Sequence, residues 1–336
     1  MRRLYLVASI IAATIGIFAD AIAADSPDSI YVRVAPARYR IRREATIKTD
    51  KSDAVVYLPL PADGPAHDIE KLSHTEGEIV EIHGSPGEKR VKISIPPGER
   101  KGVPVFVEFE AVTWGCKVDF DKIAARKILP YDKDSELYRQ YTKQELPFFD
   151  PEHEKVRKAV AAIGSEAVDD LDFARRAYFH AIEAITLNGK AYLAPVPLAD
   201  TLKDMKGSEY HCGNYLVSIL RGRGIPARNV FALTVSGRMR RWIEFYLEGC
   251  GWIPLHIRIK NESNHVTPES WFGLAVEPPY WFDRQPYSVV MGYTDMNHDI
   301  PGAQENRNIK RYTSNSDIYL GGGREEKSRL IIEALQ

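Results

Sequence analysis

The chain has 336 residues, 44% of them hydrophobic, with 45 basic and 46 acidic side chains. This length and this hydrophobic content predict two globular domains with cores of their own and exclude a disordered chain. The formal net charge of −1 gives no global electrostatic reason to expect a nucleic acid or an acidic membrane surface as a partner.

The N-terminal stretch, residues 1–23, has the order of a secretory signal. Two arginines precede an apolar run over residues 4–19, and a small-x-small cleavage pattern ends at Ala23. The run is shorter than the about 20 residues that a bilayer span needs, and no stop-transfer segment follows it in the sequence. We therefore expect an exported protein, periplasmic or secreted, that is cleaved near Ala23/Ala24 and keeps no membrane span.

Residues 29–118 favour strands. The runs "DAVVYLPLPADG", "VKISIPPG" and "VPVFVEFEAV" alternate or are rich in β-branched residues, and proline and glycine separate them. In the last run, Val105, Val107 and Phe109 would point to one side of a sheet and the residues between them to the other. This block is predicted to be a β-sandwich domain.

Helices replace strands after a polar connector at residues 119–150, whose tyrosines suggest some burial. One helix is expected from Pro151 to Gly164, and a second ends near Asn188-Gly189. His180 lies on the second helix, where a partly buried packing role is favoured over a catalytic one. Three strands follow a third helix, with Glu248–Gly251 as the hairpin turn between the last two. Residues 151–300 therefore form an α+β domain with helices packed on an antiparallel sheet, and residues 301–336 a C-terminal tail.

Three cysteines, Cys116, Cys212 and Cys250, are an odd number, so at most one disulfide can form and one thiol is left over. No CxxC pair occurs, and the histidines do not stand at metal-ligand spacing from cysteines or acids, so we expect neither a metal nor a cofactor. Cys212 precedes the apolar stripe of the third helix. A thiol at a helix N-terminus has a lowered pKa, which makes Cys212 a candidate nucleophile.

Several motifs together resemble the bacterial transglutaminase-like superfamily, and the order in which they occur is the family's. The resemblance spans most of the mature chain and implies a papain-like fold after the β-sandwich. The motifs are "KG" at Lys206-Gly207, "LRGRGIPAR" ending at Arg228, "RWIEFYL" with Trp242 and Glu244, "GWIPLH" with Trp252, and "WFG" at Trp271 to Gly273.

The resemblance implies a cysteine at a helix N-terminus, a histidine on a strand and an aspartate on the next strand. This chain departs from that pattern. Arg240 stands where the family has its histidine, and arginine stays protonated and cannot act as a general base. His256 stands where the family has its aspartate. Without a gap, Glu209 takes the nucleophile position; with one helical turn deleted, Cys212 takes it instead.

Two main functions stay open at this point. The lost acid–base residues favour a non-catalytic domain that binds a peptide or a protein in the remnant cleft, where Trp242, Glu244 and Trp252 would be scaffold and cleft residues. The alternative is a cysteine enzyme for acyl transfer or amide hydrolysis, with Cys212 as nucleophile and His256 as proton acceptor. In a third, weaker view the sandwich is the working part. The oligomeric state is left open.

Overall fold

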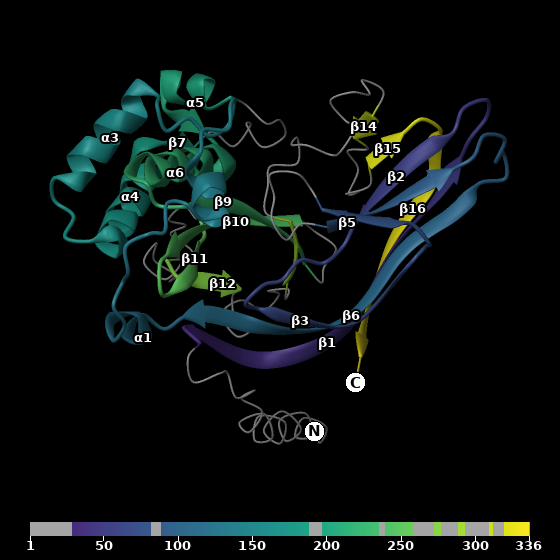
Figure 1. Cartoon of the computed structure of the whole chain (residues 1–336), viewed down its shortest axis with the longest axis horizontal. Helices are drawn as coiled ribbons and strands as arrows, with labels where there is room; N and C mark the ends of the chain where they lie inside the picture. Colours follow the sequence, from purple (N-terminus) through teal and green to yellow (C-terminus); the bar gives the residue numbers. More distant parts are fainter. Residues whose placement is uncertain are drawn as a thin grey trace, which may run out of the picture.

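The computed structural model describes residues 29–81, 89–187, 197–234, 239–257, 272–276, 288–292, 309–311 and 319–335. The expected signal segment and its cleavage site at Ala23/Ala24 lie outside these residues. Within the described part, no helix combines the length and the apolar character that crossing a membrane requires. Figure 1 shows the helices gathered at one end of the molecule, with the long strands β1 and β6 running from there to the other end.

Two antiparallel sheets make up the strand-rich part of the molecule. In the first, the described strands run in the order β12-β6-β1-β16, and β3 also pairs with β6. The second has the order β14-β15-β2-β5-β4. The strands of the first sheet are β1 Tyr31–Lys48, β3 His67–His74, β6 Val103–Val118, β12 Leu274–Val276 and β16 Arg324–Leu335. Those of the second are β2 Ala54–Pro59, β4 Glu78–Glu81, β5 Lys89–Ile95, β14 Ile309–Arg311 and β15 Tyr319–Gly321.

The two sheets share one hydrophobic core. Ile41 and Phe109 from the first sheet belong to the same buried cluster as Val56 and Ile93 from the second. The alternation predicted for "VPVFVEFEAV" holds, because Val105, Val107 and Phe109 are each at most 2% exposed. An N-terminal region rich in strands is therefore present, as the sequence indicated.

The C-terminal residues are not a tail, contrary to the expectation for 301–336. β16 pairs antiparallel with β1 from Arg38↔Leu335 to Lys48↔Arg324, and β15 pairs with β2. The yellow strand β16 runs beside β1 in Figure 1. Pairing between segments so far apart in sequence leaves no local pattern, which is why the sequence analysis missed it.

The helical part lies between these strands in sequence. Its main helices, α3, α4 and α6, pack around one core that includes Phe173, Tyr178 and Leu216. The expected connector contributes two helices of its own, and its Tyr141 is buried, as predicted for its tyrosines. The helices are α1 Phe120–Ala124, α2 Glu136–Thr142, α3 Glu154–Gly164, α4 Asp170–Ala184, α5 Leu198–Asp204 and α6 Glu209–Arg223.

α4 ends earlier than the sequence pattern indicated. The helix stops at Ala184, and Thr186–Leu187 forms the short strand β7, which pairs in parallel with β8 at Lys206–Gly207. β-branched Ile185 and Thr186 fit extended backbone better than a helix end. β8 ends at Gly207, directly before Ser208, the N-cap residue of α6.

A third antiparallel sheet packs against α6. Its described strands have the order β11-β10-β9-β13, with bounds β9 Ala227–Thr234, β10 Met239–Leu247, β11 Gly251–Leu255 and β13 Ser288–Gly292. The predicted hairpin turn at Glu248–Gly251 is confirmed, because β10 ends at Leu247, β11 begins at Gly251, and Cys250 N donates to Leu247 O over 2.9 Å. The fold is thus mixed α and β with antiparallel main sheets.

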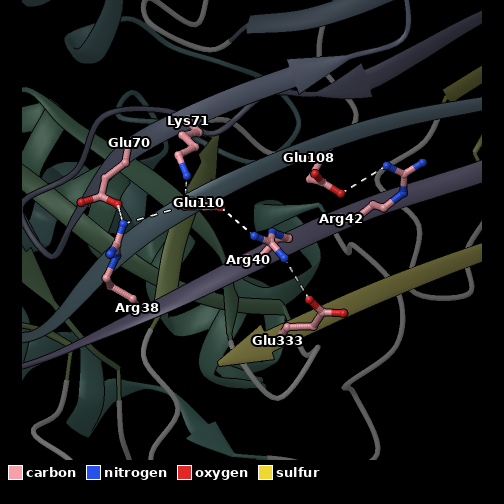
Figure 2. A network of polar contacts seen from close by, with 8 residues as sticks. All are labelled: Arg38, Arg40, Arg42, Glu70, Lys71, Glu108, Glu110 and Glu333. Carbon is pink, nitrogen blue, oxygen red and sulfur yellow. Dashed lines mark hydrogen bonds and ion pairs between the residues drawn. The ribbon is translucent and has the colours of Figure 1, made fainter. Parts of the chain in front are cut away.

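The outer side of the first sheet carries a network of ion pairs, drawn in Figure 2. Glu110 of β6 is at its centre and is only 7% exposed. Its carboxylate lies 2.8 Å from Lys71 Nζ and 2.9 Å from Arg40 Nη2, and Arg38 is 3.8 Å away. These charges pair with one another across β1, β3 and β6, so this side of the sheet is a solvated layer of alternating charge.

Candidate active site

The start of α6 places Glu209 and Cys212 one helical turn apart. Ser208 is the N-cap and Glu209 is the first residue of the helix. His211 completes the cap, because its Nδ1 accepts a hydrogen bond from Ser208 N over 2.9 Å. A carboxylate at this position is favoured by the positive end of the helix dipole. Glu209 is thus a half-buried carboxylate at the N-terminus of α6.

Cys212 lies one turn further into α6 and is part of the protein core. Its side chain is 2% exposed, and its Sγ donates to the carbonyl oxygen of Ala181 in α4 over 3.2 Å. Burial, with a smaller contribution from the charge of Glu209, raises the pKa of the Cys212 thiol to about 12. A reactive cysteine has the opposite character: partial exposure and a lowered pKa.

β10 carries Arg240 and Trp242, two residues that the sequence analysis discussed at and next to the "RWIEFYL" motif. Arg240 lies directly opposite Ala232 of β9, and Trp242 lies opposite Val230. Trp242 is 2% exposed, and its ring stacks on that of His256, with centroids 5.5 Å apart and planes inclined by 26°. His256 itself is 3% exposed.

The sheet separates Cys212 from the ring of His256. Gly213, the residue next to Cys212, faces β10, because a Cβ built on it would lie 3.0 Å from Ile243 and 3.9 Å from Ile257. Neighbouring residues in extended chain point to opposite sides. The rings of Trp242 and His256 therefore lie on the side of the sheet that faces away from α6, and the geometry does not assemble Cys212 and His256 as a pair.

A buried ion pair joins the two family-like motifs on β9 and β10. Arg228 donates from Nε and Nη2 to Glu244 Oε2, over 3.0 Å and 2.8 Å, and Trp242 Nε1 donates to Glu244 Oε1 over 3.1 Å. The guanidinium also lies 3.7 Å from the ring centroid of Trp252. Glu244 and Trp252 are accordingly scaffold residues that hold β9, β10 and β11 together.

Tyr210, the residue after Glu209, contacts Arg241 of β10. The Arg241 guanidinium lies 3.7 Å from the Tyr210 ring centroid, and both side chains are half-buried. The Tyr210 ring also meets His211 edge-on at 5.3 Å. The sequence analysis did not single out Tyr210, since an aromatic residue inside a helix start is more often core. Arginine on an aromatic face is a common recognition surface for carboxylates and carbonyls.

Groups of three or more histidine, cysteine, aspartate or glutamate side chains that could hold a metal ion are not found among the described residues. Arg241 and burial both lower the pKa of His211, burial having the larger effect, so that imidazole is neutral at pH 7. Its Nδ1 is already used by the helix cap.

Comparison with known proteins identifies the domain. Residues 157–257 match the family model of the transglutaminase-like superfamily, so this part of the chain is a transglutaminase-like domain. A search of the curated proteins gave no significant match.

Solved structures extend the likeness beyond that domain. A candidate cysteine protease of Cytophaga hutchinsonii superposes with a TM-score of 0.54 at 12% identity, over 91% of this chain and 93% of that one. The periplasmic domain of TgpA from Pseudomonas aeruginosa gives a TM-score of 0.36 at 12% identity, over 66% of this chain and 86% of that one. At such low identity the first likeness supports the fold alone, which includes the strand-rich region.

Proposed function

We propose that this protein is a non-catalytic transglutaminase-like protein that binds a peptide or a protein segment at the start of α6, outside the cytoplasm. Glu209, Arg240 and His256 replace the cysteine, histidine and aspartate that the family resemblance implies. A glutamate, an arginine and a histidine in these positions cannot perform thiol acyl transfer, because the nucleophile is absent and arginine does not accept a proton.

The burial of Cys212 is the observation that carries the proposal. The thiol is 2% exposed, its pKa is raised, and it donates a hydrogen bond to Ala181 of α4. It therefore meets none of the conditions for attack on an amide carbonyl. Tyr210 and Arg241 support the binding role, because they offer an aromatic face and a cation beside the helix start. The apolar N-terminal run with its small-x-small site supports export.

Alkylation of the native protein by iodoacetamide tests the catalytic part. Modification is read residue by residue by mass spectrometry between pH 6 and 9. We expect Cys250, which is half-buried, to react and Cys212 to react only after unfolding. In the variant Glu209→Cys, the new thiol at the first residue of α6 should react faster than Cys250 at pH 7, because the helix N-terminus stabilises a thiolate.

Two outcomes would overturn the non-catalytic assignment. One is rapid alkylation of Cys212 at pH 6 to 7 in the folded protein. The other is amide hydrolysis or acyl transfer on casein peptides that Cys212→Ser abolishes while Cys250→Ser leaves it intact. Either result would favour the cysteine enzyme instead.

Retention of casein tryptic peptides by the immobilised protein tests the binding part. Arg241→Ala should reduce the retained peptides by about tenfold, which corresponds to loss of one charge-assisted hydrogen bond. Arg176→Ala is the matched control, because Arg176 is an exposed arginine on α4 paired with Asp172 and Glu166. Equal retention by the wild-type protein and both variants would show that the start of α6 is not the binding surface.

A further inference from the structure

The strand-rich region reaches across to the side of the third sheet that carries His256. Ala62 lies between β2 and β3 and forms one buried apolar cluster with Val230, Ala232 and Trp242. Ala232 is directly opposite Arg240, and Trp242 stacks on His256. The cluster therefore lies against both sheet positions that correspond to the family's acid–base residues.

The segment 60–66 is fixed at several points. His67 Nε2 lies 2.8 Å from the carbonyl oxygen of Ala62, and Arg33 Nε donates to the carbonyl oxygen of Pro65 over 2.7 Å. The backbone of Leu60 donates to Lys89 O over 3.0 Å, and that of Trp114 donates to Ala66 O over 2.8 Å. A loop tied at both ends and in its middle has little freedom to move independently.

This contact contributes to the burial of Trp242, on which the ring of His256 stacks. Trp242 and His256 point away from α6, so α6 does not cover them, yet they are only 2% and 3% exposed. Ala62 is itself 4% exposed, and the small side chain lets the backbone approach the sheet closely. Asp63, the next residue, faces solvent.

We infer that the segment 60–66 is an internal cover of the remnant catalytic face, held on it by Ala62 and by the His67 hydrogen bond. It closes the face that carries Trp242 and His256, and any substrate or ligand of that face must first displace it. The inference deepens the proposed function and rests on its assignment of Arg240 and His256. It also explains why binding is directed to Tyr210 and Arg241, outside the covered face.

Diethyl pyrocarbonate labelling of the full-length protein tests the cover, with each histidine read by mass spectrometry. In the wild-type protein His256 should react at least about tenfold more slowly than His180, which is only partly buried. Ala62→Glu places a charge in the apolar cluster and should raise the His256 rate by about tenfold or more, with the His180 rate unchanged. Asp63→Asn, at the neighbouring exposed position, should leave both rates as they are.

Circular dichroism and a cooperative melting transition establish that each variant is folded. If Ala62→Glu does not fold, His67→Ala decides, because it removes the hydrogen bond to the Ala62 carbonyl and leaves the apolar cluster in place; it should raise the His256 rate less, but measurably. The inference fails if His256 in the wild-type protein reacts as fast as His180, or if folded Ala62→Glu keeps it protected. No ligand is needed, so this result is independent of the thiol and peptide experiments.

Discussion

The strand pair β9–β10 and the start of α6 belong to the same domain but differ in how their polar side chains are paired and buried. On β9 and β10, Arg228, Trp242 and Glu244 satisfy one another with buried hydrogen bonds. At the start of α6, the carboxylate of Glu209 is on the first residue of the helix, and the thiol of Cys212, one turn later, is in the core. The comparison shows that the ion pair and its hydrogen bonds on β9 and β10 depend on packing inside the sheet, whereas the start of α6 carries half-buried polar side chains.

Removing Glu244 should disrupt the buried hydrogen bonds between β9 and β10 and produce the largest loss of stability among these variants. Glu244→Ala leaves the Arg228 guanidinium buried without its partner, which costs about 3–5 kcal/mol of unfolding free energy. Urea denaturation followed by circular dichroism measures it. Lys158→Ala, which removes an exposed ion pair with Glu154 on α3, is the control and should be almost neutral. A loss for Glu244→Ala no larger than the control's would mean that the pair does not hold the strands.

Removing the His211 cap at the start of α6 should have an intermediate effect on stability. His211→Ala removes the acceptor for Ser208 N–H and should cost about 1 kcal/mol, as loss of a helix cap does. His153→Ala is the matched control, because His153 caps the more exposed start of α3 through the same kind of bond to Lys155 N. The control should cost less, and the reverse order would contradict a specific role for His211.

The same histidine contributes to a dependence of stability on pH. Burial lowers the pKa of His67, of His180 and of His211 below the ordinary 6.5, and Arg33 and Arg241 add to this at His67 and His211. The unfolded chain then binds more protons, so these groups stabilise the fold above pH 6.5 and lose that contribution as the pH falls below it. Melting temperatures between pH 8 and 5 should fall accordingly, and less steeply in His211→Ala.

A change on the charged side of the first sheet should have the smallest effect on stability of the variants compared. Glu110→Gln removes a carboxylate shared by Lys71, Arg40 and Arg38, and Lys71 and Arg40 hold the pKa of that carboxylate below the ordinary value. Because these partners reach solvent, the melting temperature should fall less than for Glu244→Ala. The difference from the wild-type protein should shrink further in 1 M NaCl, where the Debye length is about 3 Å. A salt-independent loss would mean that the network is effectively buried.

Sequence patterns predicted the elements whose signals are local. The hairpin at Glu248–Gly251, the helix that ends at Gly164 and the buried side of "VPVFVEFEAV" were all predictable from turn residues and from hydrophobic period. The nucleophile position was not, because the family resemblance gives Glu209 when it is read without a gap and Cys212 when one helical turn is deleted. The structure adds what the sequence could not show, that the Cys212 thiol is buried against α4.

Contacts between distant segments could not be predicted from the sequence either, because they depend on how the whole chain packs. The contact of Ala62 with Trp242 joins a loop of one region to a strand of another, and an alanine in a proline-rich loop carries no signal of it. Arg228 was visible in "GIPAR", but its role depends on the register of β9 against β10. Strand register is set by the whole sheet and not by either strand alone.

The pairing of β16 with β1 makes the order of synthesis matter. β1 is made early in synthesis, yet one of its edges finds its partner only when residues 324–335 have been made. Until then this edge is open, and an open strand edge invites aggregation. Residues 157–257, which match the family model, are all made before residues 324–335. A chaperone that shields β1 during this interval would therefore raise the yield of folded protein more than one that acts on the helical part.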